Sequence, residues 1–284
     1  MKIAMTGANG FIGRNLLDAL RYKVDDVEII AIVRNCNFTD IKASEALKIV
    51  EMDIHNPPDN AFEEIGEPDV LIHLAWSGLP NYNSLHHFES ELPKQYDFLS
   101  TLVKHGLKSL VVTGTCFEYG MQSGELDESL PAAPENPYGF AKNTLREQLE
   151  YLQKEIKFNL TWARLFYIYG NHQTGNSIFA QLKRAINSND KTFDMSQGEQ
   201  LRDYLDVGLV AKYITSLALL EKNIGVINVS SGTPISIRNL VEGWIKKHSW
   251  EITLNLGQYP YPNYEPLAFW GKNGKLQYHI ETDS

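Results

Sequence analysis

The sequence contains very little cysteine. Only two of its 284 residues are cysteines, Cys36 and Cys116, and they do not form a Cys-x-x-Cys pair. A disulfide framework or a zinc site would need more cysteines at closer spacing. We therefore expect a reducing compartment and no metal site.

Long apolar runs and an excess of basic charge are also missing. No apolar run approaches the roughly 18 to 20 residues that a transmembrane helix needs. The first residues, 1–7, already form a strand-like run and leave no room for the apolar part of a signal peptide. The formal net charge is −9, whereas nucleic-acid binding needs clustered Lys and Arg. We expect a cytoplasmic protein that binds neither membranes nor nucleic acid.

The sequence does contain a regular alternation of apolar runs and longer amphipathic segments. With 43% hydrophobic and 21% charged residues, its composition is that of a globular protein. Runs rich in Val, Ile and Leu predict strands buried on both faces of a parallel sheet at 2–6, 27–33, 47–52, 70–75 and 109–113. Segments 88–105 and 137–154 are long enough for crossover helices. The pattern predicts an α/β fold with a Rossmann-type, doubly wound parallel sheet.

The second half of the sequence is less regular. It predicts strands at 160–167, 202–207 and 226–229, helices at 177–187 and 210–221, a further helix capped by Ser236, and an irregular tail at 257–270. We assign residues 1–170 to an NADP-binding Rossmann domain, to which segments at about 203–230 return. Residues 171–284 form mainly a smaller substrate-binding domain.

Three glycines, Gly7, Gly10 and Gly13, stand between the first strand and the first helix. Glycine allows a positive φ and a close approach of the backbone, and a helix N-terminus offers N–H groups to a pyrophosphate. The turn predicts a dinucleotide site, with a purely structural turn as the alternative. The cofactor-binding residues expected here are Gly7, Asn9, Gly10, Phe11, Ile12 and Gly13.

The end of the second strand bears on the choice of cofactor. Arg34 stands there, and no Asp or Glu follows the strand directly. An acidic residue would bind a free ribose 2′-hydroxyl, whereas Arg can pair with a 2′-phosphate. We expect NADP(H), with NAD as the alternative if Arg34 is only a solvated side chain. After the third strand, Asp53 could accept from the adenine amino group or cap a helix, and Ile54 beside it is a further candidate contact.

A tyrosine and a lysine, Tyr138 and Lys142, lie four residues apart on the helix predicted at 137–154. This spacing places both side chains on one face of the helix. A nearby ammonium lowers the pKa of a phenol, which makes it a better acid–base group. Thr115 stands at the carboxyl end of a predicted strand, where it could donate to a substrate oxygen or cap the following turn.

Taken in order, segments 6–13, 73–75, 115–120, 138–142, 164–170 and 202–204 resemble the extended short-chain dehydrogenase/reductases, the family of nucleotide-sugar epimerases, dehydratases and reductases. The resemblance covers about residues 1–235. It implies that Tyr138 transfers a proton, that Lys142 holds the nicotinamide ribose, and that Thr115 takes the place of the usual Ser. The segment at 73–75 adds Leu74 and Ala75 to the expected cofactor contacts.

The resemblance also suggests substrate contacts. It implies that Arg202 meets the substrate diphosphate, although pairing with Asp203 or Asp206 is the alternative. Tyr167 stands where the family often has an Asn that contacts the phosphates. The remaining candidate substrate-binding residues are Trp76, Cys116 and Phe117, with a packed loop as the alternative role of Trp76.

The residues after Thr115 limit which of the family's reactions we expect. Sugar dehydratases of the family carry Asp and Glu there, where this chain has Cys116 and Phe117. We predict an NADPH-dependent ketoreductase acting on a 4-keto-6-deoxyhexose joined to dTDP, GDP, UDP or CDP, in surface polysaccharide synthesis. An NAD-dependent 4-epimerase and a non-catalytic cofactor-binding regulator are the alternatives. The family implies a homodimer through helices 88–105 and 137–154.

Overall fold

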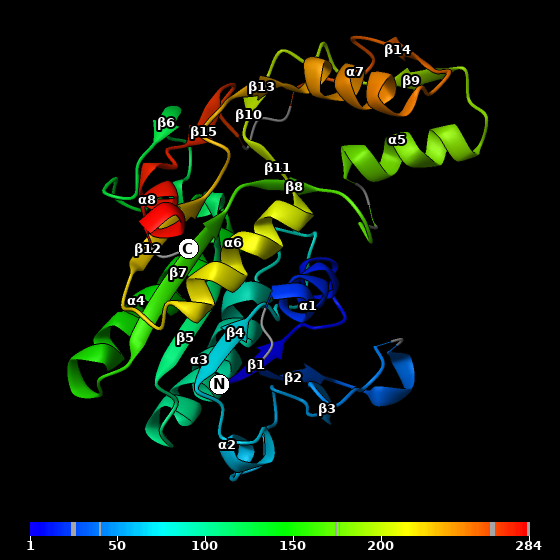
Figure 1. Cartoon of the computed structure of the whole chain (residues 1–284). Helices are drawn as coiled ribbons and strands as arrows, with labels where there is room; N and C mark the ends of the chain where they lie inside the picture. Colours follow the sequence, from blue (N-terminus) through cyan, green and yellow to red (C-terminus); the bar gives the residue numbers. More distant parts are fainter. Residues whose placement is uncertain (24–26, 40, 174, 176, 262–264, 283–284) are drawn as a thin grey trace.

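The computed structural model describes the whole chain apart from residues 24–26, 40, 174, 176, 262–264 and 283–284 (Figure 1). Within the described residues, seven strands form a parallel sheet in the order β12-β7-β5-β4-β1-β2-β3. The strands are β1 (Lys2–Thr6), β2 (Glu28–Val33), β3 (Leu47–Glu51), β4 (Val70–His73), β5 (Ser109–Thr115), β7 (Asn159–Leu165) and β12 (Gly225–Val229). The predicted α/β fold is confirmed. The strand order reverses between β1 and β4, which is where sheets of this kind bind ligands.

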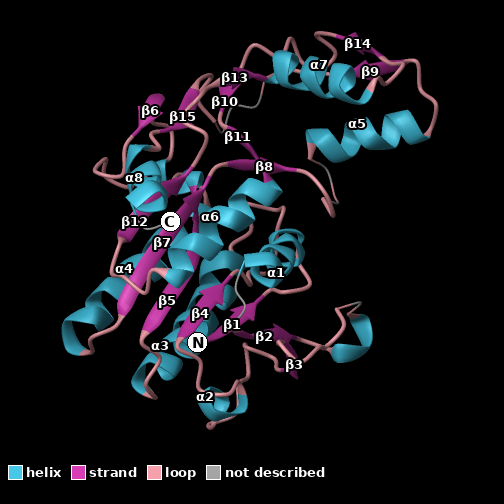
Figure 2. Ribbon diagram, in the orientation of Figure 1, coloured by secondary structure: helices cyan, strands magenta, loops and turns pink. Residues whose placement is uncertain are grey.

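Helices cover both faces of this sheet (Figure 2). On one face α1 (Phe11–Lys23) packs against α6 (Val207–Leu219), and on the other α3 (Leu92–Lys104) packs against α4 (Pro137–Glu155). Alternate residues of β1 supply both layers, because successive side chains of a strand point to opposite faces. Ile3 belongs to the apolar core under α1 and α6, and Ala4 to the core under α3 and α4.

A smaller lobe lies beyond the carboxyl ends of the strands, at the top of Figure 1. It contains α5 (Ile178–Asn187), β9 (Thr192–Asp194), α7 (Ile237–His248) and β14 (Thr253–Asn255). Its apolar core includes Trp244, whose ring lies 4.8 Å from the ring of Phe179. Short strand pairs join the lobe to the sheet: β8 (Tyr167–Tyr169) with β11 (Tyr204–Asp206), β10 (Leu201–Arg202) with β13 (Ile235–Ser236), and β6 (Gly124–Leu126) with β15 (Phe269–Gly271).

Several element boundaries differ from those predicted. The strand expected at 202–207 is divided, because Arg202 pairs with Ile235 and Tyr204 pairs with Tyr167. The following helix, α6, starts at Val207 rather than at 210, since Asp206 caps it by accepting from the Gly208 amide at 2.8 Å. The strand expected at 160–167 is divided as well, because β7 ends at Leu165 and β8 begins at Tyr167.

The helix expected at 88–105 and the tail also differ in detail. The helix begins as a π-helical turn, η2 (His87–Glu91), before continuing as α3. The tail predicted as irregular contains β15 and is followed by a helix that the sequence did not suggest, α8 (Gly274–Thr282). Part of that tail, residues 262–264, lies outside the described residues.

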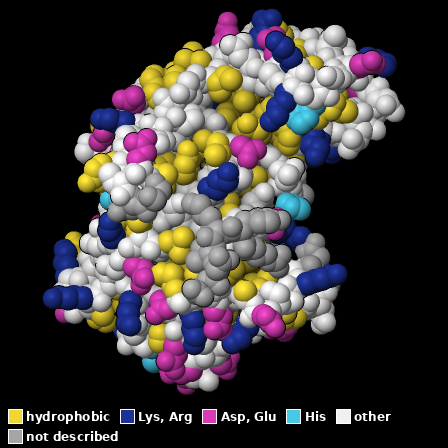
Figure 3. Space-filling model, viewed as in Figure 1, with side chains coloured by type: hydrophobic (Ala, Val, Ile, Leu, Met, Phe, Trp, Pro, Cys, Tyr) yellow, Lys and Arg dark blue, Asp and Glu magenta, His cyan; other side chains and the backbone are white. Residues whose placement is uncertain are grey.

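The distribution of charge and the length of the helices can be compared with the sequence predictions. On the described part of the face in Figure 3, acidic and basic side chains are interspersed. None of the described helices is long and apolar enough to cross a membrane.

Candidate active site

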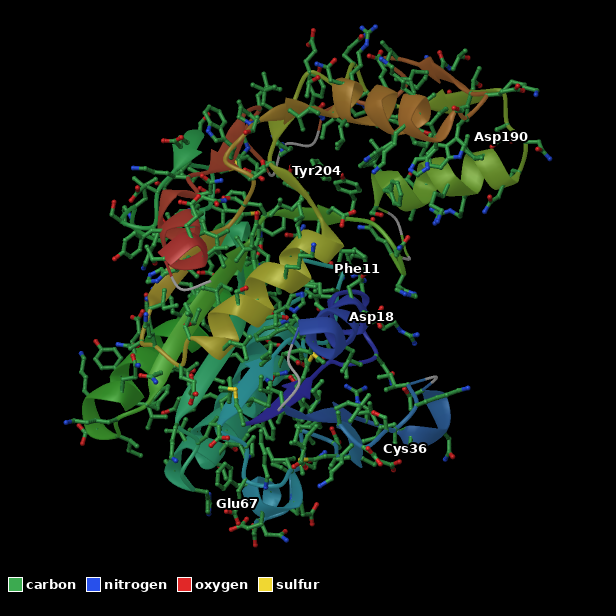
Figure 4. The ribbon with its side chains drawn as sticks, in the orientation of Figure 1. Phe11, Asp18, Cys36, Glu67, Asp190 and Tyr204 are labelled. Atoms are coloured by element: carbon green, nitrogen blue, oxygen red, sulfur yellow. The ribbon has the colours of Figure 1, made fainter. Side chains whose placement is uncertain are left out.

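The glycine turn between β1 and α1 is closely packed. Gly7 has a φ of +70°, and a Cβ added to it would lie 3.0 Å from the backbone nitrogen of Ala75. A Cβ added to Gly13 would lie 2.3 Å from the Gly7 carbonyl oxygen. Both positions therefore require glycine, and the turn leads directly into Phe11 at the start of α1, labelled in Figure 4.

The hydroxyl of Thr6 joins this turn to the segment after β4. Its oxygen lies 3.0 Å from His73 Nδ1 and accepts from the amides of Leu74 and Ala75 at 3.2 and 3.3 Å. These contacts explain why β4 ends at His73 and not at residue 75. They also place Leu74 and Ala75, both predicted cofactor contacts, beside Gly7.

The end of β2 lies near an acidic residue that does not follow β2 in the sequence. Arg34 is exposed there, as the prediction requires. However, β3 runs alongside β2, and Glu51 at its end accepts from the Cys36 amide at 2.8 Å. A carboxylate therefore lies close to the β2 end although none follows Arg34 in the chain. Asn9 reaches the same region, where its side-chain oxygen accepts from the Thr39 hydroxyl.

Asp53 lies in the loop after β3. It accepts from the His55 amide at 3.1 Å and from the Asn56 side chain at 2.9 Å. Partial burial raises the pKa of Asp53, but these hydrogen bonds and the charge of Arg34 outweigh it and lower the pKa. The alternative role as a helix cap is wrong, because the next helix, α2 (Ala61–Glu64), begins well beyond it. The side chain of Ile54 is buried in the core.

Tyr138 and Lys142 come from the first turns of α4, as predicted. The helix starts at Pro137, and Asn136 caps it by accepting from the Gly139 amide at 2.8 Å. Both functional side chains are buried, with 8% of Tyr138 and 1% of Lys142 exposed. Burial raises the pKa of Tyr138 and lowers that of Lys142 to about 7. In the chain alone, therefore, the neighbouring lysine does not lower the pKa of the tyrosine as expected.

The start of α4 lies directly on the end of β5. Lys142 Nζ donates to the Thr113 carbonyl at 2.9 Å, and a Cβ on Gly139 would lie 2.6 Å from the Phe117 carbonyl oxygen. Thr115, the last residue of β5, accepts from the Phe117 amide at 3.3 Å and so caps the 3-10 turn η3 (Cys116–Tyr119). Thr115 and the start of α4, which carries Tyr138 and Lys142, therefore lie together at the carboxyl end of the sheet.

The end of β5 is fixed by a buried acid that the sequence did not reveal. Glu118 accepts from the Thr115 amide at 2.8 Å, from Trp162 Nε1 at 2.9 Å and from Arg164 Nε at 2.7 Å. Each of its partners from β7 is also buried. All the hydrogen bonds of this carboxylate thus serve to hold the strand end.

Of three further predicted substrate residues, Arg202 and Cys116 are buried and Tyr167 is half-buried. Arg202 is 2% exposed and pairs with Glu265 at 2.7 Å, so both alternatives, pairing with Asp203 or with Asp206, are wrong. Tyr167 donates to the other oxygen of Glu265 at 2.6 Å. Cys116 is also buried, and burial raises the pKa of its thiol.

The two remaining candidates, Trp76 and Phe117, are aromatic and half-buried. The Phe117 ring lies 4.8 Å from that of Tyr82, which itself lies 5.6 Å from Tyr138. The Trp76 ring lies 6.0 Å from the Tyr138 ring, in an edge-to-face arrangement. These aromatic rings therefore lie around the tyrosine of the site.

Residues 3–230 match the model of the family described as "NAD dependent epimerase/dehydratase family". The chain belongs to this family. The match confirms the resemblance to the extended short-chain dehydrogenase/reductases.

Two relatives align with most of the chain. It is 31% identical to dTDP-6-deoxy-L-talose 4-dehydrogenase (NAD(+)) from Aggregatibacter actinomycetemcomitans, over 95% of this chain and 99% of that protein. It is 27% identical to GDP-6-deoxy-D-talose 4-dehydrogenase from the same organism, over 90% of this chain and 83% of that one.

Solved structures of family members share the fold at lower identity. UDP-N-acetylglucosamine 4-epimerase from Methanobrevibacter ruminantium M1 superposes with a TM-score of 0.85 at 21% identity, covering 98% of this chain and 91% of that one. UDP-glucuronic acid 4-epimerase from Bacillus cereus gives 0.81 at 22% identity, covering 100% and 94%.

Two of the predicted site features lie at the carboxyl end of the sheet. A glycine turn opens a helix at the switch point of the sheet, and the start of α4, with Tyr138 and Lys142, lies on the end of β5. The sequence did not identify three carboxylates, because each contacts a residue from another part of the chain. They are Glu51, Glu118 and Glu265. Among them, Glu118 stands in one of the matching segments, but nothing local showed its partner.

Proposed function

We propose that the chain is an NADPH-dependent reductase of the 4-keto group of a 6-deoxyhexose joined to a nucleoside diphosphate. The observation that carries this proposal is that the first turns of α4, which carry Tyr138 and Lys142, lie on the end of β5, which carries Thr115. When bound, the nicotinamide supplies the hydride for the sugar carbon. Tyr138 transfers its phenolic proton to the carbonyl oxygen, so the ketone becomes an alcohol.

Thr115 has a defined part in this step. Its oxygen accepts from the Phe117 amide, which leaves its hydroxyl hydrogen to be donated to the substrate oxygen. A fixed donor at the oxygen where negative charge develops lowers the barrier without reorganisation. With the cofactor bound, the Lys142 ammonium and the positive charge of the oxidised nicotinamide would together favour the phenolate that remains after proton transfer, until solvent reprotonates it.

The substrate class is supported by the residues after Thr115 and by the relatives. Elimination of water would need free carboxylates there, but Cys116 is buried and Glu118 is committed to Arg164 and Trp162. The reverse of a 4-dehydrogenation is the reduction of a 4-keto group, and a relative of nearly equal length is named as a dTDP-6-deoxy-L-talose 4-dehydrogenase. We therefore place dTDP-linked 4-keto-6-deoxyhexoses first.

The preference for NADPH rests on Arg34, the exposed cation at the end of β2. It would pair with the 2′-phosphate of the cofactor. The nearby Glu51 and the NAD(+) in the name of the 31% identical relative favour the unphosphorylated cofactor instead. Both forms must therefore be compared in every assay.

A screen of 4-keto-6-deoxy nucleotide sugars, beginning with dTDP, tests the proposal. We expect loss of NADPH absorbance in proportion to a new 4-hydroxyl in the product, identified by NMR. No consumption of NADPH or NADH with any of these ketones would overturn it. The screen includes a 4-hydroxy sugar with NADP⁺ or NAD⁺, since the reaction is reversible.

A 4-epimerase is the second candidate, favoured by Glu51 at the place where a ribose hydroxyl would lie. An epimerase returns the hydride to the same sugar, so it would retain bound NAD after purification and consume no added cofactor. A non-catalytic regulator is less well supported, because Tyr138 and Lys142 are both present and meet in the site.

The remaining predictions stay part of the proposal. We place the enzyme in the cytoplasm, in the synthesis of surface polysaccharide sugars, with 171–284 mainly forming the substrate-binding domain. A homodimer through η2, α3 and α4 is supported by Phe140, which is 49% exposed on α4 and packs against Phe88 of η2. Light scattering on the purified protein measures the mass of the assembly.

A further inference from the structure

A buried carboxylate on the turn η2 organises the loop that follows β4. Glu91 is fully buried and accepts from the Ser77 amide at 3.0 Å, from the Ser77 hydroxyl and from the Gln95 side chain at 2.5 Å. Its two oxygens also lie 3.2 Å from His55 Nε2 and 3.4 Å from His86 Nε2. Burial raises the pKa of Glu91, but the hydrogen bonds from Ser77 and Gln95 outweigh it and lower the pKa to about 2. The loop is therefore anchored to a permanent negative charge.

The residue before the anchored Ser77 is Trp76, and its indole is held at a second point. Trp76 Nε1 donates to His87 Nδ1 at 3.1 Å, and His87 Nε2 lies 2.8 Å from the Asn81 carbonyl oxygen. An indole N–H only donates and a carbonyl only accepts, so the His87 hydrogen is on Nε2 and the ring is neutral. His87 is fully buried, and its ring lies 5.2 Å from that of Tyr138.

The face of the held indole lies against Lys142. The ammonium nitrogen is 4.1 Å from the centre of the Trp76 ring, well within the range of a cation–π contact. Within the described part of the chain, Lys142 forms no salt bridge, and its ammonium donates to the Thr113 carbonyl. The negative face of the indole ring thus offsets part of the cost of burying the Lys142 cation. The carboxylates of Glu118 and Glu91 stabilise this cation from further away.

We propose that Trp76 is a positioning residue for Lys142. Its indole face holds the ammonium where it meets the cofactor ribose, and Glu91 and His87 fix the indole. The inference rests on the proposed function, because Lys142 acts in that site. It gives Trp76 a role different from the sugar contact that the sequence suggested, and it gives Glu91 and His87 a role in the site although neither belongs to the motifs of the family.

The affinity for reduced cofactor, measured against pH, tests this inference without any sugar. Lys142 contributes to binding only while it is charged, so affinity falls as pH rises through its pKa. Trp76→Leu removes the ring and Glu91→Gln removes the charge, so in both variants the fall is expected about half to one pH unit lower than in the wild type. Trp76→Phe keeps an aromatic face and should shift the curve less.

The measurement is the dissociation constant of NADPH, and of NADH in parallel, from nicotinamide fluorescence between pH 6 and 9, with unfolding temperatures recorded for each variant. Matched controls are Trp250→Leu, at a tryptophan stacked on His248, and Glu242→Gln, in an exposed pair with Arg238. Neither control should move the curve.

The outcomes separate this inference from the proposed function. Curves of folded Trp76→Leu and Glu91→Gln that coincide with the wild-type curve would overturn the inference. A higher KM for the sugar in Trp76→Leu, with an unchanged cofactor curve, would also overturn it and make Trp76 a sugar contact. If the wild type reduces no sugar ketone but the shifts occur, the proposed reaction fails and the positioning of Lys142 stands.

Discussion

The carboxylate of Glu118 lies 2.7 Å from Arg164 Nε, and neither side chain reaches solvent, with 0% and 2% exposed. The pair joins the turn after β5 to the neighbouring strand β7. Because Thr115 also donates its amide to Glu118, the pair holds the strand end that carries a proposed catalytic hydroxyl.

Removing one partner of this pair should destabilise the fold strongly. Glu118→Ala leaves the Arg164 cation buried without its carboxylate, which costs about 3–5 kcal/mol in the free energy of unfolding. Urea unfolding at pH 7 measures the loss. The control, Glu242→Ala, breaks an exposed pair with Arg238 and should cost less than about 1 kcal/mol. Equal losses of unfolding free energy in the two variants would show that the buried pair contributes no more to stability than the exposed pair.

Removing the hydroxyl of Tyr138 should abolish turnover but not cofactor binding. Tyr138→Phe keeps the ring contacts with Trp76 and His87 but has no proton to transfer. We expect kcat to fall by about 100-fold to 10,000-fold, with the dissociation constant of NADPH nearly unchanged. Stopped-flow measurement of NADPH oxidation gives kcat. Unchanged turnover in a folded variant would remove Tyr138 from the mechanism.

Reversing the charge at the end of β2 should change the cofactor preference. Arg34→Asp would repel a 2′-phosphate and accept from a free 2′-hydroxyl, so the ratio of kcat/KM for NADPH over NADH should fall by about tenfold to 100-fold. Lys104→Asp, the same charge reversal at an exposed site on α3, is the control. A ratio that stays constant in Arg34→Asp would mean that Arg34 is only a solvated side chain and that Glu51 governs the choice.

The parts of the fold and site that could be predicted are those encoded locally. Apolar runs gave the central strands, because a strand buried on both faces needs apolar residues throughout. The turn from Gly7 to Gly13 and the helical spacing of Tyr138 and Lys142 are equally local, since each depends on a few consecutive residues. Even the N-cap of α7, Ser236, followed from the adjoining pattern, and it accepts from the Asn239 amide at 3.1 Å.

The parts that escaped prediction depend on residues that meet only in the fold. Arg202 was expected to meet the substrate diphosphate, with a neighbouring aspartate as the alternative partner, but it pairs with Glu265, 63 positions away. Glu51 comes near Arg34 because β3 lies beside β2, and no local pattern encodes that pairing. Glu91 stands within an expected helix and resembles any surface acid in sequence, although it is fully buried. No fixed spacing in the sequence predicts a contact of this kind.

The hydrogen bonds that lower the pKa of Glu91 also predict how stability depends on pH. Its pKa is about 2 in the folded chain, against an ordinary value of 4.5. Because the folded-state pKa is lowered, the stabilisation is fully present above about pH 5 and is lost as pH falls from there toward 2. Glu91→Gln cannot titrate, so the advantage of the wild type over this variant, on the order of 3 kcal/mol at pH 7, should shrink steadily below pH 5.

Urea unfolding of both proteins at pH 7, 5, 4 and 3 measures this difference. The comparison of the two proteins at each pH cancels the titration of groups remote from Glu91, whereas His55 and His86 contact it and belong to the difference that is measured. Glu242→Gln serves as the control, since its exposed carboxylate should give a difference close to zero at every pH. A wild-type advantage that is the same at pH 3 as at pH 7 would contradict a charged Glu91 as the anchor of the Trp76 loop.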